Sequence, residues 1–250
     1  MKRTRKKFLN TLLLCLFTAF LLGAFSSILS LKAKDKSAGN RRIGQSKYSG
    51  EKITYDVMLG KVRLGRMRFS NIGNAPLEGR ILNLMVMETK LTHFSDTERI
   101  YSDPQTLLPV KVERDIMNIF THEKINEHYD QTNFTVTIIK KKGMKKQERL
   151  IIKKDDLIHN AALLPYYVRH TPNLDVGRVI IANLPTRRLE IELVSEEELT
   201  VPAGTFKAYH FSSTPRQIDI WISADSRRIP LKIQTSGALG YSMVMKEYSP

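Results

Sequence analysis

The sequence predicts a mainly β protein: a single curved antiparallel sheet or open β-barrel with one short covering helix, preceded by an N-terminal hydrophobic helix. From Lys52 onward, apolar and polar residues alternate, which is the pattern of strands with one buried face. Short segments separated by turn residues follow one another, and one mid-chain stretch has helical spacing instead. A length of 250 residues with 42% hydrophobic residues allows one or two domains with a packed core. It excludes disordered, collagen-like and polytopic membrane proteins.

Residues 1–31 predict a signal peptide or a signal anchor. Five basic residues between Lys2 and Lys7 precede an uncharged run from Phe8 to Leu31. This run is longer than the about 7–15 apolar residues of a cleaved signal and long enough for the about 20 of a membrane-spanning helix. Small residues favour cleavage after Ser26, whereas the apolar continuation favours retention, so both alternatives stay open. In either case the following chain is exported, to the periplasm or the periplasmic face of the inner membrane.

Residues 32–49 predict a flexible basic linker, because they are rich in Lys, Arg, Ser, Gly and Asn. Residues 50–250 then form the exported β-rich domain. The single cysteine, Cys15, lies in the uncharged run, so the exported part has no thiol for a disulfide, a cysteine nucleophile or a zinc cluster. A body without cysteine suits an oxidising compartment.

The first strand of the body shows the alternation clearly, with Ile53, Tyr55 and Val57 separated by polar residues. A turn follows at Gly60, and the alternation changes parity after Gly65, which predicts a β-bulge. Similar patterns predict further strands at Ile81–Leu91, Thr97–Tyr101, Leu108–Arg114, Ile116–Tyr129, Phe134–Lys141, Glu148–Lys153, Arg178–Leu184, Leu189–Ser195, Thr205–Ser212, Gln217–Ile222, Leu231–Thr235 and Tyr241–Tyr248.

The exception is Asp155–Arg169, which predicts a short helix. Leu157, Ala161 and Leu164 fall on one helical face, and the two aspartates at the start match the positive end of the helix dipole.

Two segments near the C-terminus predict turns. Val201–Thr205 reverses the chain because Pro202 restricts φ and Gly204 adopts conformations that other residues resist. Asp225–Pro230 predicts a turn with solvated charges. The alternative is a buried ion pair of Asp156 or Asp225 with Arg169 or Arg228.

Five groups of residues occur in a characteristic order from Gly50 to the C-terminus. They are Gly50–Val57 with Gly60 and Gly65, Leu108–Val110 with Glu113 and Arg114, Asp156 with Leu163, Tyr166, Tyr167, Arg169 and Gly177, Val201–Ala208, and Trp221–Leu231. Together they resemble an uncharacterised bacterial exported family, domain of unknown function 3108. The resemblance implies a periplasmic β-rich domain, akin to open barrels that carry lipoproteins or lipids across the envelope, and implies no activity. The candidate binding residues taken from its motifs are Tyr55, Gly65, Asp156, Tyr167, Arg169, Gly204, Trp221 and Arg228.

The sequence indicates no catalytic, metal or cofactor site, and we expect a protein that is not an enzyme. His122-Glu123 suggests a zinc protease, but the position four after His122 is Asn126, and His128 would lie on the same strand about 20 Å away. The acidic run Glu196–Glu198 predicts a solvated strand edge, because adjacent strand residues face opposite ways. Nucleophile elbows, phosphate-binding loops and dinucleotide fingerprints are missing from the sequence.

The net charge of +15 needs a partner or a structural explanation. Part of it belongs to the N-terminal basic cluster, and another part lies in Lys140–Lys146, where Gly143 marks the tip of a predicted hairpin. Export and the lack of neighbouring aromatic residues argue against nucleic acid. An anionic membrane surface or lipid is the better partner, and lysine as protection against strand aggregation is the structural alternative.

The leading hypothesis is therefore a non-catalytic envelope protein whose curved sheet binds an apolar or lipid-like ligand between inward residues such as Tyr55, Val57, Trp221 and Tyr241. The alternative is a structural or interaction module that holds an envelope partner and has no pocket. A hydrolase would need convergent carboxylates or histidines in a cleft.

Overall fold

The computed structural model describes residues 48–236 and 240–250, in which fourteen strands form one sheet. The predicted signal or anchor and nearly all of the predicted linker lie outside the described residues. The strands are β1 (Lys52–Leu59), β2 (Val62–Leu77), β3 (Arg80–Leu91), β4 (Phe94–Ser102), β5 (Pro109–Asn118), β6 (His122–Asp130), β7 (Thr135–Lys142), β8 (Glu148–Lys153), β9 (Val179–Asn183), β10 (Arg188–Val201), β11 (Gly204–Thr214), β12 (Ile218–Ser223), β13 (Pro230–Thr235) and β14 (Ser242–Ser249).

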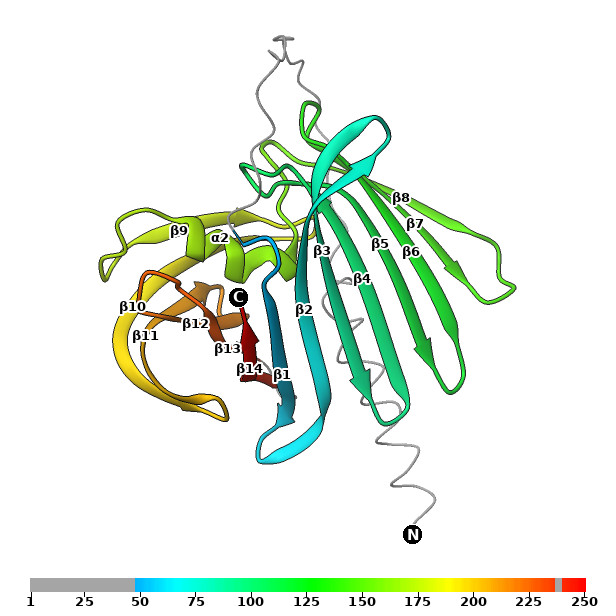
Figure 1. Ribbon diagram of the computed structural model, residues 1–250. Helices are drawn as coiled ribbons and strands as arrows, with labels where there is room; N and C mark the ends of the chain where they lie inside the picture. The colour runs from blue at the N-terminus through cyan, green and yellow to red at the C-terminus, as the bar shows by residue number, and fades with distance from the viewer. Residues whose placement is uncertain (1–47, 237–239) are drawn as a thin grey trace. The chain divides into compact units, whose positions relative to one another are not determined.

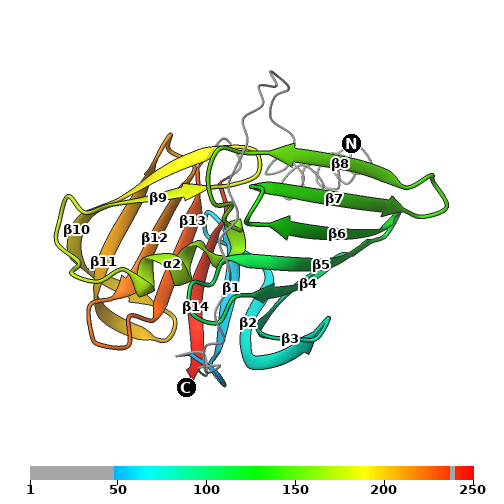
Figure 2. The same ribbon diagram turned by 90° about the horizontal axis from the view of Figure 1, so that it is seen from above.

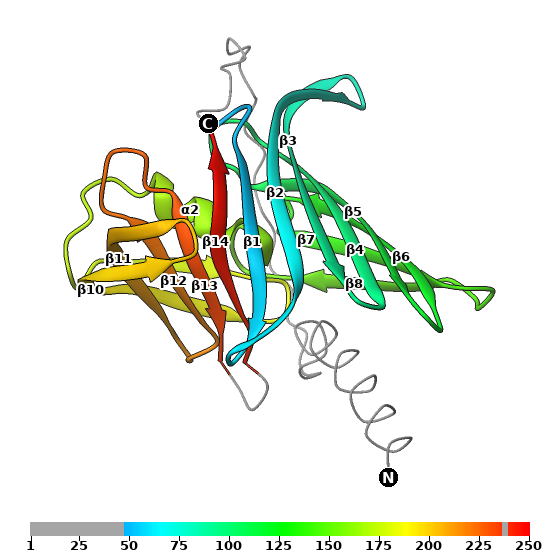
Figure 3. The same ribbon diagram turned by 60° about the horizontal axis from the view of Figure 1, so that its bottom comes forward.

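The strand order is β8-β7-β6-β5-β4-β3-β2-β1-β14-β13-β12-β11-β10-β9, and every neighbouring pair is antiparallel. The first and last strands therefore pair in the middle of the sheet (Figure 3). Figures 1 and 2 show β2–β8 and β9–β13 curving away on either side of β1 and β14. Within the described residues the edge strands β8 and β9 do not pair, so the sheet is not closed. The predicted curved antiparallel sheet with one short helix is confirmed.

The alternation seen in the sequence sets the two faces of the sheet. Ile53, Tyr55 and Val57 of β1 are buried, whereas Thr54 and Asp56 between them are partly exposed. We call the face that carries Tyr55 the inner face and the face that carries Asp56 the outer face. Cross-strand partners lie on the same face, so the strand register assigns residues of the other strands to one face or the other.

The predicted turn and bulge near Gly60 and Gly65 are confirmed. Gly60 has φ +57°, and the register between β1 and β2 shifts after Val57, which pairs with Gly65, while Met58 pairs with Arg63. A Cβ atom on Gly65 would lie 2.2 Å from the carbonyl oxygen of Lys90, so a side chain cannot be placed there without moving the backbone of β3. The bulge therefore depends on glycine for space rather than for φ.

The predicted strand Ile116–Tyr129 is wrong as one element, because it divides into the end of β5 and the whole of β6. The Asn118 side chain accepts hydrogen bonds from the backbone N–H groups of Phe120 and Thr121, at 2.9 Å each, and so stabilises a turn. The local asparagine turn overrides the strand pattern around it.

The helix also begins later than predicted. A 3₁₀ turn, η1 (Ala161–Leu163), leads into α2 (Leu164–His170), and Asn160 caps the start by accepting a hydrogen bond from the Ala162 N–H. Asp156 lies before the helix and accepts from the Leu157 N–H and from the side chain of Asn183. The predicted role of acidic residues at the helix N-terminus is therefore wrong, because an asparagine cap takes that place.

The segment before the helix connects the two margins of the open sheet. The Gln131 side chain, just after β6, donates to the carbonyl oxygen of Ile158 and accepts from its N–H, both at 2.9 Å. The next residue, His159, donates its backbone N–H to Asn183 at the end of β9, at 2.7 Å. This segment thus joins the β6–β7 turn to the edge strand β9 by hydrogen bonds.

Helix α2 contacts β12 and β13 (Figure 1). It lies on the inner face, because the ring of Tyr166 is 5.9 Å from the ring of Phe69, whose cross-strand partner is Ile53. In the described residues, no helix has the length and apolar character needed to cross a membrane.

Candidate functional site

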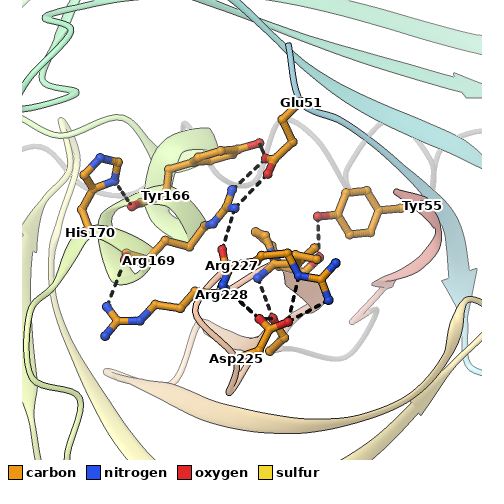
Figure 4. A network of polar contacts seen from close by, with 11 residues as sticks. Glu51, Tyr55, Tyr166, Arg169, His170, Asp225, Arg227 and Arg228 are labelled. Carbon is orange, nitrogen blue, oxygen red and sulfur yellow. Dashed lines mark hydrogen bonds and ion pairs between the residues drawn. The ribbon is translucent and has the colours of Figure 1, made fainter. Parts of the chain in front are cut away.

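A buried ion pair connects α2 to the start of β1 (Figure 4). Arg169 donates from its two terminal nitrogens to the two carboxylate oxygens of Glu51, at 2.7 and 2.8 Å. Both side chains are almost completely buried, with 1% and 4% exposure. Burial alone would lower the pKa of Arg169, but the hydrogen bonds and negative charge of Glu51 raise it above its ordinary value. Arg169 therefore stays charged, and its two hydrogen bonds to Glu51 fix the position of α2 relative to β1.

Aromatic rings and backbone carbonyl groups surround this pair. The guanidinium carbon of Arg169 lies 3.7 Å from the centre of the Tyr48 ring, and the Tyr166 hydroxyl donates to Glu51 at 3.1 Å. Arg169 also donates to the carbonyl oxygen of Arg227 at 3.0 Å. Arg228 in turn donates to the carbonyl oxygens of Arg169 and Thr171. These contacts hold the C-terminal end of α2 against the turn between β12 and β13.

The structure brings together three of the eight candidate residues taken from the sequence motifs. Arg169 and Arg228 meet as described, and the Tyr55 hydroxyl donates to the carbonyl oxygen of Pro230 at 2.9 Å, at the end of the same turn (Figure 4). Tyr167, also on α2, points elsewhere and donates to the carbonyl oxygen of Leu107 at 3.2 Å. The geometry of these four residues is that of a scaffold between helix and sheet.

The other four candidates are dispersed. Asp156 lies in the segment before the helix, Gly65 in the β2 bulge, Gly204, with φ +135°, at the β10–β11 turn, and Trp221 on β12. The sequence analysis quoted Glu51 only as part of a motif and did not identify it as a partner of Arg169.

The proposed buried pairing of Asp156 or Asp225 with Arg169 or Arg228 is not what the structure shows. Asp225 accepts hydrogen bonds from the backbone N–H groups of Arg227 and Arg228, and its carboxylate pairs with the Arg227 side chain, exposed to solvent. This is the predicted turn with solvated charges.

Trp221 lies on the outer face, so the expected inward position beside Tyr55 is wrong. Trp221 pairs with Lys232, Lys232 with Val244, and Val244 with Asp56, which places all of them opposite to Tyr55. The Trp221 ring stacks on the His210 ring, with centroids 4.2 Å apart. The Nζ of Lys232, on β13, lies 4.4 Å from the centre of the Trp221 ring.

Glu197 also holds Trp221, because its carboxylate accepts a hydrogen bond from the indole N–H at 2.7 Å. The intervening residue on β11 is Ala208, the cross-strand partner of Glu197, whose small side chain leaves room for the carboxylate to reach. Glu197 thus lies within β10, exposed as predicted for the acidic run, but it has a structural partner.

A second buried polar cluster lies on the inner face of β4, β5 and β6. Thr89 pairs with Met67 and with Asp96, which places Asp96 on the same face as Tyr55. Arg114 on β5 donates to both carboxylate oxygens of Asp96. Its cross-strand partner on β4, Glu98, has a carboxylate oxygen 3.9 Å from the same guanidinium. We call Asp96, Glu98, Arg114 and Glu127 the acidic cluster.

Glu127 completes the acidic cluster from β6. Its carboxylate accepts a hydrogen bond from the Tyr129 hydroxyl at 2.5 Å, and burial raises its pKa. Burial, together with the charges of Asp96 and Glu127, raises the pKa of Glu98 to about 7 despite the opposing effect of Arg114. Three carboxyl groups thus share one guanidinium.

The sequence analysis missed this cluster because it assigned polar residues of strands to the outer face. The sequence signal that would have found it is the spacing in β4, where Asp96 and Glu98 fall at the same alternate positions as the apolar residues Phe94 and Ile100, and the structure shows all four to be buried.

Two buried polar side chains lie on the inner face of β3, one of them, Thr89, beside the acidic cluster and the other, Asn83, six positions away along the strand. The Thr89 hydroxyl and the Asn83 amide have no hydrogen-bond partner in the described part of the chain, and both residues are almost completely buried. Thr89 is the direct cross-strand partner of Asp96, and Asn83 is that of Ser102 on the same face. Buried polar groups normally have partners, so this part of the inner face has unused hydrogen-bonding capacity.

Toward the β8 edge the inner face carries apolar residues together with a further ion pair, in which Lys140 of β7 lies 2.7 Å from the carboxylate of the buried Glu123 on β6. Glu127 pairs with Ile138, and Ile138 pairs with Leu150 on β8. Ile138 is buried, whereas Leu150 is 50% exposed although it points to the inner side. The inner face at the β8 edge therefore includes a partly uncovered apolar position, Leu150, next to buried apolar residues.

The histidines that suggested a metal site do not converge. His122 lies 2.7 Å from the carboxylate of Asp115, and His128 is six positions further along β6. Over residues 48–236 and 240–250, no group of three or more His, Cys, Asp or Glu residues is arranged to hold a metal ion.

The sheet, its edge-bridging segment and its inner polar clusters define a mainly β domain with an open antiparallel sheet. The chain belongs to the family described as "Protein of unknown function (DUF3108)", whose model matches residues 54–246. No curated protein matches the chain.

Two solved structures are similar over much of the chain. A β-barrel-like protein of the domain of unknown function DUF1849 from Brucella abortus has 8% sequence identity and a TM-score of 0.46, covering 82% of this chain and 98% of its own. A candidate exported protein with a YmcC-like fold from Bacteroides fragilis has 11% identity and a TM-score of 0.30, with the same coverage.

Proposed function

We propose that this protein is a non-catalytic domain of the cell envelope that binds an apolar or lipid-like ligand with a polar head group on the inner face of β3–β8. The proposal rests on two features of the same face. Thr89 and Asn83 are buried without hydrogen-bond partners in the described residues, and the apolar side chain of Leu150 is partly uncovered. An amphiphile satisfies both, because its head group supplies hydrogen bonds and its chains cover Leu150.

The envelope location in this proposal rests on the N-terminal residues. The basic cluster followed by the uncharged run from Phe8 to Leu31 is the pattern of export, with the body of the chain in the periplasm.

What supports a binding role rather than catalysis is that the polar groups have fixed partners. Asp96 accepts both of its closest contacts from Arg114, and Glu127 accepts from Tyr129.

The acidic cluster also favours one alternative function, a hydrolase. Convergent carboxyl groups with one pKa near 7 are the arrangement that general acid–base catalysis uses, and Glu98 has a pKa of about 7. We rank this second because Glu98 is buried and because Arg114 neutralises part of the cluster.

Two neighbouring residues of the edge strand β8 test the ligand proposal. Leu150 points to the inner face, and Ile151, 58% exposed, points to the outer face. Each is replaced by aspartate in the full-length protein, which is purified from native membranes and extracted for lipid mass spectrometry. We expect a stoichiometric amphiphile in the unmodified protein and in Ile151→Asp, and its loss in Leu150→Asp.

Protein without extractable amphiphile, or equal loss in both variants, would contradict ligand binding at this face. Glu98→Gln provides the test of the alternative, because a hydrolase that uses this carboxyl group would lose activity on ester and glycoside substrates while retaining the bound amphiphile.

A further inference from the structure

Four turns of the sheet lie along one end of β1–β8. Because neighbouring strands are antiparallel, the β1–β2, β3–β4, β5–β6 and β7–β8 turns share one end of the sheet, along the lower margin in Figure 1. The β5–β6 and β7–β8 turns touch directly, since the Gly143 N–H donates to the carbonyl oxygen of His122 at 2.9 Å. We call these two turns with their flanking residues 117–124 and 140–149 the basic tip.

Large apolar side chains point into solvent at the basic tip. Phe120 is 77% exposed, Met144 is fully exposed, and Met117 and Ile119 are each half exposed. The β5–β6 turn does not depend on these apolar side chains, because hydrogen bonds of Asn118 to Phe120 and Thr121 stabilise it. Apolar residues gathered at adjacent turns are a feature of surfaces that bind another apolar phase.

Lysines surround these apolar residues. Between Lys140 and Arg149 the chain has six basic residues and one acidic residue, Glu148. The exposed acidic group of the β5–β6 hairpin, Asp115, already contacts His122 and Lys124. Lys141, Lys145 and Lys146 are exposed to solvent. The basic tip therefore combines positive charge with protruding apolar groups.

We propose that the basic tip docks onto an anionic phospholipid bilayer, with Phe120, Ile119 and Met144 inserted among the head groups and the lysines bound to their phosphates. Insertion of apolar residues and attraction of basic residues act together at such surfaces, and each adds to the affinity. Lysine as protection against strand aggregation explains the charges but not the exposed Phe120 and Met144. A protein partner would need acidic complementarity together with apolar contacts, whereas an anionic bilayer supplies both.

The basic tip adjoins the proposed ligand site, since Leu150 directly follows Arg149, but the docking proposal depends on Ile119, Phe120 and Met144, whereas the ligand proposal depends on the inner-face residues Thr89 and Leu150. Failure of lipid extraction would therefore leave the docking proposal intact, and failure of docking would leave the ligand proposal intact.

The test uses the full-length chain with Cys15 replaced by serine, so that a single introduced cysteine can carry an environment-sensitive fluorophore. The label is placed at Ile119→Cys in the basic tip, and at Val176→Cys, 65% exposed in the loop between α2 and β9, as the control. The protein is reconstituted into vesicles of phosphatidylcholine alone or mixed with phosphatidylglycerol. Any attachment through the N-terminal residues is common to both labels and both vesicles.

We expect the label at position 119 to shift to the blue and to be quenched by nitroxide lipids in the anionic vesicles, and the label at position 176 to remain unchanged. Adding Lys145→Gln and Lys146→Gln should lower the equilibrium constant for contact roughly 30-fold, from about 1 kcal/mol for each lysine. High salt should act in the same direction.

Identical emission at position 119 in the two vesicle types would overturn the proposal. So would an equal response at position 176, or lysine substitutions without effect. Phe120→Ser with the label at position 119 supplies a second variant, since an apolar contribution requires weaker quenching in anionic vesicles.

Discussion

Glu51→Gln is the substitution that tests the buried ion pair most directly. The change keeps the size of the side chain but removes its charge, and leaves the buried guanidinium of Arg169 with two neutral acceptors, the new amide oxygen and the carbonyl oxygen of Arg227 at 3.0 Å. The Nε of Arg169 has no partner within the described residues, so it cannot compensate.

The expected loss is large because one buried charge remains without its partner. Removing one member of a buried pair costs roughly 3–5 kcal/mol, whereas replacing both members with apolar residues is often close to neutral. We expect Glu51→Gln to lower the free energy of unfolding by about 3 kcal/mol, since the amide oxygen can still accept one hydrogen bond. The double variant Glu51→Gln with Arg169→Met should lose less free energy of unfolding than the sum of the losses in the two single variants.

The measurement is urea unfolding monitored by circular dichroism. An unchanged m value, the slope of the free energy of unfolding against urea concentration, would show that the unfolded state is the same in all variants. Arg63→Met is the matched control, because Arg63 and Asp56 are also 2.7 Å apart but Arg63 is 46% exposed. An exposed pair contributes about 0–1 kcal/mol. A loss for Glu51→Gln no larger than that of the control, or simple additivity in the double variant, would refute the reasoning.

Two further predictions concern the acidic cluster and the N-terminus. Burial raises the pKa of Glu98 from 4.5 to about 7 in the folded protein. Its contribution to stability is therefore fully present below about pH 4.5 and is lost as the pH rises to about 7, because the folded state holds the proton more tightly. Between about pH 4.5 and about pH 7, the free energy of unfolding of the unmodified protein should fall by roughly 3 kcal/mol more than that of Glu98→Gln. A difference between the two proteins that does not change with pH would contradict the buried position of Glu98. For the export signal, alkaline phosphatase fused after Pro250 should be active outside the inner membrane, and activity confined to the cytoplasm would exclude export.

Strand positions were predictable because strand sequences with one buried face carry their own period. The alternation around Tyr55 correctly gave the inward side of β1, and glycine at a parity change correctly gave the β2 bulge. Two element boundaries were predicted wrongly where an asparagine side chain sets the backbone conformation. Asn118 ends β5 and Asn160 starts the helix, and both act through hydrogen bonds to the backbone that a hydropathy pattern does not contain.

The candidate site was less predictable, because its contacts join distant parts of the chain. Arg169 was identified from a motif, but its partner Glu51 lies 118 positions away and was not. Trp221 was expected to face inward because it is large and apolar. The register places it on the outer face, where His210, Lys232 and Glu197 cover it.

By itself, the sequence determined the β-rich class, the antiparallel order of short strands, the lysine-rich hairpin and the expectation of export, because each depends on residues that are close in the chain. Only the tertiary structure decided that β1 pairs with β14, and that Asp96, Glu98, Arg114 and Glu127 meet on one face. It also decided that Phe120 and Met144 lie at adjacent turns. The physical reason is register: which side chains meet depends on how separate strands align, and a shift of one residue would move every side chain of a strand to the opposite face.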